Sequence, residues 1–159
     1  MRRGKLLGIY IAPRKTAALE SLDEAELVLG KGLEGDRYFK KAGTFSFANP
    51  KGPGREITLI EEEALTAAER DYGIKLAPAE SRRNLITRGV ALNHLVGRRF
   101  RVGGVELRGV RLCEPCGHLE KLTRPGVAKA FVHRGGLRVE IIRGGALRVG
   151  DPIRAAASA

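Results

Sequence analysis

Cysteine and aromatic residues are scarce in this chain of 159 residues: it has two cysteines, no tryptophan, five phenylalanines and three tyrosines. A domain of this length can bury a sufficient core without covalent cross-links, so the two thiols need not be structural. The scarcity of aromatic rings leaves few side chains on which unpaired nucleic-acid bases could stack. Both absences direct attention to the chemistry of the two thiols.

Long apolar runs are also missing, since none reaches the roughly 18 residues of a membrane span. The start, MRRGKLLGIYIAPRK, places basic residues before a short apolar patch, but no small-residue cleavage site follows it. We interpret residues 5–12 as a first strand rather than a signal peptide, and predict a cytoplasmic protein with no membrane association. In that reducing compartment, free thiols usually take part in chemistry or bind a metal.

Acidic residues are rare in the second half of the chain. Residues 80–159 carry 16 Lys or Arg against 6 Asp or Glu, whereas residues 1–79 carry 13 against 12, which together give the net charge of +11. Such a field attracts anions, including phosphate groups and nucleic acid. However, the basic residues alternate with apolar ones in strand-like runs, so we rank a nucleic-acid-binding β-barrel last among the functional alternatives.

Short strands dominate the pattern. Residues 98–112 alternate apolar and charged side chains around Gly103-Gly104, which predicts a β-hairpin with a two-residue turn. Residues 137–153 show the same pattern around Gly144-Gly145 and predict a second hairpin. Residues 25–30 and 55–61 predict further strands, and residues 30–54 form a long loop rich in Gly and Pro.

One longer helix is predicted over residues 61–72, with acids at its N-terminal end and Gly73 after it. A short helix is expected between residues 123 and 136. Many short strands with few helices predict a single domain with a mainly β, barrel-like fold and short helical additions.

Both cysteines lie in the run RLCEPCGHLEKL, as Cys113 and Cys116. A structural zinc site would need a second ligand pair, and haem attachment would need a His directly after the second Cys, where Gly117 stands. A thioredoxin-like redox pair would need a βαβ context, which the predicted hairpins do not provide. Haem attachment is therefore excluded, whereas a zinc site and a redox pair stay open as weaker interpretations. Two buried thiols, or a reactive thiolate that is favoured by nearby cations and able to carry sulfur or bind a soft metal, are the other interpretations.

Three other runs hold candidate polar residues: the first is interpreted as an ordinary turn, and the other two could bind an anion or could turn the chain. In GLEGDRY, Asp36 and Arg37 follow two glycines; in SRRNLITRG, Arg82 and Asn84 precede a strand; in HRGG, Arg134 precedes a Gly pair. Arginine forks bind phosphate in pairs, and Asn can both donate and accept hydrogen bonds. Ordinary turns with solvated charges would give the same patterns.

The ordered series GLEGDRY, REITLIEEEAL, RRNLITRGVALNHLVGRRFRVGGVEL, CEPCGHLEKLT, HRGGL and LRVGDPI resembles the MOSC domain family, named for the C-terminal domain of molybdenum-cofactor sulfurases. The resemblance spans about residues 6–153 and is strongest to small stand-alone bacterial members. It implies a β-rich, barrel-like fold that binds a molybdopterin-type molybdenum cofactor. It also implies an essential cysteine, matched best by Cys116 and second by Cys113, as molybdenum ligand or sulfur acceptor.

By the same resemblance, Arg82 and Asn84 match the pattern that holds the pterin-phosphate end of the cofactor. Asp36 and Arg37 match a run whose role is either binding or loop shape, and Arg134 matches a pattern of unassigned role. Some relatives reduce N-hydroxylated compounds with electrons from a partner flavin or iron–sulfur protein. The chain has no room for the desulfurase domain of full sulfurases, so a separate cysteine desulfurase would donate any sulfur. A metal-free persulfide carrier is the alternative.

Overall fold

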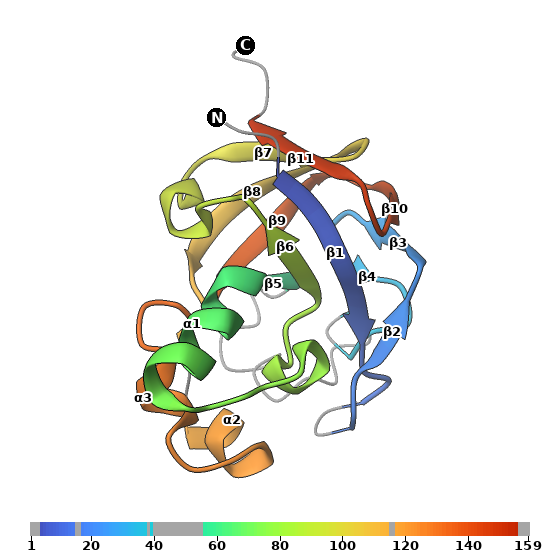
Figure 1. Ribbon diagram of the computed structural model, residues 1–159. Helices are drawn as coiled ribbons and strands as arrows, with labels where there is room; N and C mark the ends of the chain where they lie inside the picture. Colours follow the sequence, from blue (N-terminus) through green and yellow to red (C-terminus); the bar gives the residue numbers. More distant parts are fainter. Residues whose placement is uncertain (1–3, 15–16, 38, 40–55, 115–116, 156–159) are drawn as a thin grey trace.

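The computed structural model describes residues 4–14, 17–37, 39, 56–114 and 117–155. In this part of the chain, seven strands close into a barrel because β1 pairs with β11 as well as with β6 (Figure 1). Around the barrel, the order is β11 (Pro152–Ala155), β7 (Arg99–Val102), β8 (Val105–Leu112), β9 (Leu137–Arg143), β5 (Ile57–Glu61), β6 (Leu85–Arg88) and β1 (Gly4–Ile11). The predicted β-rich, barrel-like fold is confirmed.

Four further strands lie outside the closed ring. β2 (Glu20–Leu22) extends the sheet beyond β1, and a separate three-stranded sheet has the order β10 (Gly145–Arg148), β3 (Glu24–Val28) and β4 (Gly32–Leu33). The prediction of a continuous loop over residues 30–54 is therefore wrong at β4, which pairs with β3. Residues 40–54 of that predicted loop lie outside the described part of the chain.

The predicted longer helix is α1 (Glu62–Tyr72), and it ends at Gly73. Gly73 adopts a left-handed φ of 66°, and its backbone N–H donates to the carbonyl of Glu69, as expected for a glycine cap. The other helical pieces are α2 (Gly117–Leu122), α3 (Val127–Ala130) and the 3₁₀ turns η1 (Pro78–Ser81) and η2 (Leu92–Leu95). In Figure 1, α2 and α3 lie at the end of the barrel away from the chain termini.

Strand alternation builds two apolar cores. Inward side chains such as Phe100, Leu107 and Leu137 fill the barrel, and all three are fully buried. The opposite faces of β5 and β6 present Ile60 and Ile86 to the helices, where they pack in one cluster with residues of α1, α2 and α3. None of the described helices has the length and apolar character needed to cross a membrane.

One of the two predicted hairpins forms. Val102 pairs with Val105 across Gly103-Gly104, so the two-residue turn between β7 and β8 is confirmed. The second predicted hairpin is wrong, because β9 pairs with β8 and β5 whereas β10 pairs with β3. A Cβ on Gly144 would lie 2.4 Å from the carbonyl oxygen of Leu27, so this glycine allows the close approach of β3.

Candidate site around the cysteine loop

We call residues 113–116, between β8 and α2, the cysteine loop. Its first residues, Cys113 and Glu114, are hydrogen-bonded to the loop that follows α3. The backbone N–H of Cys113 donates to the carbonyl of Gly136 at 2.8 Å. The backbone N–H of His133 donates to Oε1 of Glu114 at 2.8 Å, and Nδ1 of His133 lies 2.8 Å from Oε2 of the same carboxylate. Cys113 and Glu114, at the start of the CEPC run, are therefore held against the HRGG run about 20 residues later in the sequence.

Arg83 connects both loops to the strand that begins beside it. Its Nε donates to the carbonyl of Gly135 at 2.7 Å, and its Nη2 donates to the carbonyl of Cys113 at 3.2 Å. The residue is only 9% exposed. Its neighbours Arg82 and Asn84 were predicted as site residues and Arg83 was not, because nothing in the run SRRN distinguishes the arginine that turns inward.

The glycines of the HRGG run are explained by close packing. Gly136 has a φ of 116°, and a Cβ there would lie 2.0 Å from the carbonyl oxygen of Leu59 on β5. Only glycine fits such an approach. Arg134 itself is exposed, and its positive charge favours the ionised forms of Glu61 and Asp71. The Gly pair shapes the site, since the carbonyl of Gly135 accepts from Arg83 and that of Gly136 accepts from Cys113.

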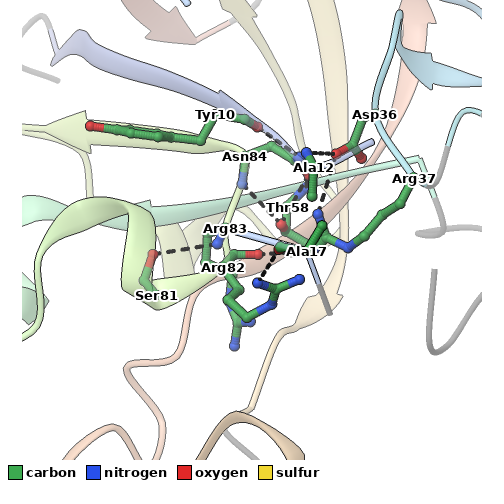
Figure 2. A network of polar contacts seen from close by, with 10 residues as sticks. All are labelled: Tyr10, Ala12, Ala17, Asp36, Arg37, Thr58, Ser81, Arg82, Arg83 and Asn84. Carbon is green, nitrogen blue, oxygen red and sulfur yellow. Dashed lines mark hydrogen bonds and ion pairs between the residues drawn. The ribbon is translucent and has the colours of Figure 1, made fainter. Parts of the chain in front are cut away.

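Asp36 and Arg37 form a buried connection between β1 and the turn before β6 (Figure 2). Oδ1 of Asp36 accepts from the backbone N–H of Ala12 at 2.9 Å and from Nη1 of Arg37 at 3.2 Å. Nη2 of Arg37 donates to the carbonyl of Arg82 at 3.1 Å, and Nη1 of Arg82 donates to the carbonyl of Ala17 at 2.7 Å. In these contacts Asp36 and Arg37 fix the loops around Arg82.

Asn84 joins three neighbouring strands. Its Oδ1 accepts from the backbone N–H and the hydroxyl of Thr58 on β5, at 3.0 and 3.1 Å. Its Nδ2 donates to the carbonyl of Tyr10 on β1 at 3.1 Å, and the side chain is fully buried (Figure 2). Three strand contacts therefore engage the amide of this predicted cofactor-binding residue.

A pocket of about 270 Å³ opens beside Arg82. Arg82 itself adopts a left-handed φ of 59°, which directs the chain sharply from η1 into β6. Glu80, on the same wall, forms an ion pair with Arg124 at 2.6 Å. The pocket is lined by Ala18, Leu19, Ala79, Glu80, Arg82, Leu122 and Thr123. Its volume is slightly below the roughly 300–1,000 Å³ of typical small-molecule sites.

Two further arginines lie next to the cysteine loop. Arg111 on β8 stands directly opposite Arg138 on β9. The pKa of Arg111 is below its ordinary value because burial disfavours its charge and Arg138 repels it, although Cys113 acts in the opposite direction. This pair was not predicted from the sequence, because neighbouring strands bring the two residues together and no local motif indicates that pairing.

The described part of the chain includes Cys113 but not Cys116. Cys113 has a free thiol and is 2% exposed. The predicted ligand Cys116 lies outside the described residues, as does the side chain of His118. Among the side chains that the structure describes, no cluster of three His, Cys, Asp or Glu could hold a metal ion.

The MOSC domain family model matches residues 46–154, which is more than half of the chain. The chain belongs to the MOSC domain family. Comparison with curated proteins finds no match. The structural comparisons below agree with the barrel described above.

Solved structures share the MOSC fold of this chain. YuaD from Bacillus subtilis superposes with a TM-score of 0.77 and 24% identity, over 96% of this chain and 94% of its own. YiiM from Geobacillus stearothermophilus gives 0.70 and 16%, over 97% and 75%. YiiM from Escherichia coli gives 0.68 and 20%, over 98% and 71%. At these identities, the likeness shows the fold alone.

Proposed function

We propose that this MOSC-domain protein binds a molybdenum cofactor of the molybdopterin type, with Cys116 as the molybdenum ligand or as a sulfur acceptor. When bound, the cofactor would supply the redox chemistry for reducing N-hydroxylated compounds. The observation that carries the proposal is the pocket beside Arg82, one wall of which is formed by Leu122 at the end of α2. That helix follows the cysteine loop directly.

The pocket lining fits the chemistry of a pterin. Four apolar side chains, those of Ala18, Leu19, Ala79 and Leu122, provide walls for a flat heterocycle. Thr123, Glu80 and Arg82 provide hydrogen-bond donors and acceptors for its polar edges. Nη1 of Arg82 donates to the carbonyl of Ala17, which fixes the guanidinium group at the lining of the pocket.

The anionic end of the cofactor needs cationic or backbone donors. The arginine pair Arg111 and Arg138 provides positive charge beside the cysteine loop. Arg83 is engaged with Gly135 and Cys113, so we assign it to positioning the loop rather than to binding phosphate. Asn84 would act in the same indirect way, by holding the strand end from which the Arg82 turn departs.

The burial of Cys113 is the reason to propose Cys116 as the reactive cysteine. A thiolate that binds a soft metal or accepts sulfur must be reachable, whereas Cys113 is 2% exposed. The Cys113 backbone is also held at both its N–H and its carbonyl. We therefore assign Cys113 to the structure of the loop and Cys116 to the chemistry.

Electrons for the reduction would come from a flavin or iron–sulfur protein, because the described barrel contains no electron-input module of its own. If the protein instead carries sulfur, a cysteine desulfurase would form the persulfide on Cys116 without any metal. Both functions use Cys116, but only the reductase function requires molybdenum.

The test is metal analysis of the wild type and of Cys116→Ser, with Cys113→Ala as the matched control. Each protein is co-expressed with a working molybdenum-cofactor pathway and purified as the full chain. We expect stoichiometric molybdenum in the wild type and in Cys113→Ala, and its loss in Cys116→Ser. Intact mass of the same samples detects a persulfide.

Molybdenum in none of the three proteins would overturn cofactor binding, and a persulfide on Cys116 would then support the sulfur carrier. Molybdenum that is retained in Cys116→Ser would show that Cys116 is not required as a ligand. Loss of molybdenum in Cys113→Ala, with normal thermal unfolding, would reassign the reactive role to Cys113.

A further inference from the structure

The outer surface of four barrel strands carries arginines directly opposite one another. Three cross-strand pairs are in register on neighbouring strands: Arg154 with Arg101, Arg99 with Arg108, and Arg111 with Arg138. Like charges directly opposite each other in a sheet repel and destabilise it. Three such pairs in succession are a feature that the packing of the barrel does not require.

We call this surface the arginine face. It consists of Arg99, Arg101, Arg108, Arg111, Arg138, Arg143 and Arg154 with two acidic residues, Glu106 and Glu140. Seven positive and two negative side chains give a balance of +5. The alternate side chains of the same strands, such as Phe100 and Val102, point into the barrel core.

The two glutamates compensate only part of this charge. Arg99 and Arg101 lie 3.7 and 3.8 Å from the carboxylate of Glu106, and Arg108 lies 3.0 Å from that of Glu140. Arg99, Arg101 and Arg108 remain 60%, 38% and 48% exposed. The ion pairs found among the described residues include neither Arg143 nor Arg154, and both are exposed.

We propose that the arginine face docks the acidic surface of a partner protein, namely the flavin or iron–sulfur protein that donates electrons. Complementary charge steers such partners together and fixes their orientation. That the partner delivers electrons rests on the proposed function. The docking surface itself is supported by the charge of the face and by the register of its strands.

An acidic protein fits this face better than nucleic acid does. The outward positions of β7, β8, β9 and β11, the strands of this face, carry no aromatic ring, so unpaired bases would find no stacking platform. Glu106 and Glu140 lie among the arginines, where they would repel a continuous row of phosphates. A protein surface of mixed charge can place a basic residue against each glutamate.

The position of the face supports a role in electron delivery. Arg111 and Arg138 form the end of the face that adjoins the cysteine loop, since Arg111 is two residues from Cys113. β11, the strand that carries Arg154, lies toward the end of the barrel that carries the chain termini (Figure 1). A partner docked on the face would thus reach the start of the cysteine loop at Cys113.

The test measures binding of two purified acidic proteins, a [2Fe–2S] ferredoxin and a flavodoxin, by fluorescence anisotropy at low and high ionic strength. The full-length protein is used without cofactor. The test variant is Arg143→Gln/Arg154→Gln, and the matched control is Arg88→Gln/Arg148→Gln, which removes two exposed arginines outside the face.

We expect at least one acidic protein to bind the wild type, with a Kd that rises at high salt. The Kd should rise about tenfold in the test variant and stay within about twofold in the control. The test variant should melt close to the wild type, because it relieves the repulsion between Arg101 and Arg154 but also removes the Arg143 charge opposite Glu106.

Three results would overturn the docking surface: no binding of either acidic protein, an equal loss in both variants, or tighter binding of a 20-base-pair DNA than of the acidic proteins. Molybdenum content, measured separately on the co-expressed wild type, reports on the proposed function. A protein that holds molybdenum but binds neither partner would refute this inference alone, and one that binds a partner but no molybdenum would refute cofactor binding alone.

Discussion

Arg83 holds the backbone of Cys113: its Nη2 donates to the Cys113 carbonyl oxygen at 3.2 Å from a side chain that is only 9% exposed. The same guanidinium donates to the carbonyl of Gly135 at 2.7 Å. A residue 30 positions away in the sequence therefore determines the geometry of the cysteine loop. The reactive chemistry proposed for this loop depends on a residue just before β6 that would not itself react.

Replacing Arg83 by Ala should destabilise the protein and loosen the cysteine loop. Two carbonyl groups would lose a charged donor in a buried setting, which costs about 2–4 kcal/mol of unfolding free energy. Urea unfolding measures the loss, and the rate at which a thiol reagent modifies Cys113 measures the loosening. Arg88 is an exposed arginine on β6, and Arg88→Ala is the control. It should change the unfolding free energy and the thiol modification rate only a little. An unchanged thiol rate in Arg83→Ala would contradict the positioning role.

Asn84 and Thr58 should act as one unit in stability. Each single variant, Asn84→Ala or Thr58→Val, removes part of the buried contact and should cost about 2 kcal/mol. Because the two side chains share hydrogen bonds, the double variant should cost less than the sum by about 1 kcal/mol. Urea unfolding of the cofactor-free wild type, the two single variants and the double variant measures this double-mutant cycle. If Asn84→Ala leaves the cofactor-free protein unaffected but removes molybdenum, Asn84 contacts the cofactor directly.

The local patterns of the sequence predict much of the barrel. The alternation around Gly103-Gly104 and the acids before α1 predict real elements, because hairpin turns and helix ends are encoded by adjacent residues. The second Gly pair, Gly144-Gly145, looks the same locally but serves a different purpose. Its meaning depends on β3, a strand more than 100 residues earlier in the chain.

Gly144→Ala tests this reinterpretation. Its Cβ would lie 2.4 Å from the Leu27 carbonyl oxygen, so β3 and β10 could not keep their pairing without moving. We expect destabilisation of about 2–3 kcal/mol, as for an overpacked position. Gly104→Ala is the matched control, because a Cβ at that turn meets open space. Its thermal unfolding should stay close to that of the wild type, and equal losses at both positions would contradict the close-approach explanation.

The candidate site is less predictable than the fold. Asp36, Arg82 and Asn84 are visible as polar residues near turns, but the sequence cannot show that Asn84 and Asp36 face inward toward backbone groups. Arg83 and the Arg111–Arg138 pair are missed for the same reason, since their partners belong to distant segments. Contacts between strands that are remote in the sequence decide which polar residues build the structure and which remain for a ligand.

Glu61, at the junction of β5 and α1, should make stability depend on pH. Burial raises the pKa of its carboxyl group above the ordinary value, and the charge of Glu63 adds to the rise. A hydrogen bond from the backbone N–H of Leu92 and the charges of Arg134 and His94 oppose the rise without cancelling it. Folding therefore favours the protonated form of Glu61.

The sign of the effect follows from this preference. The folded state binds the Glu61 proton more tightly than the unfolded state does, so the contribution of Glu61 to the unfolding free energy is complete below the ordinary carboxyl pKa. It is lost as the pH rises through the raised pKa of the folded state. Glu61→Gln keeps an oxygen that can accept from Leu92 but cannot ionise. Urea unfolding at a series of pH values should give a smaller decline for Glu61→Gln than for the wild type over this range, and identical declines would show that the Glu61 carboxylate is not destabilised by its burial.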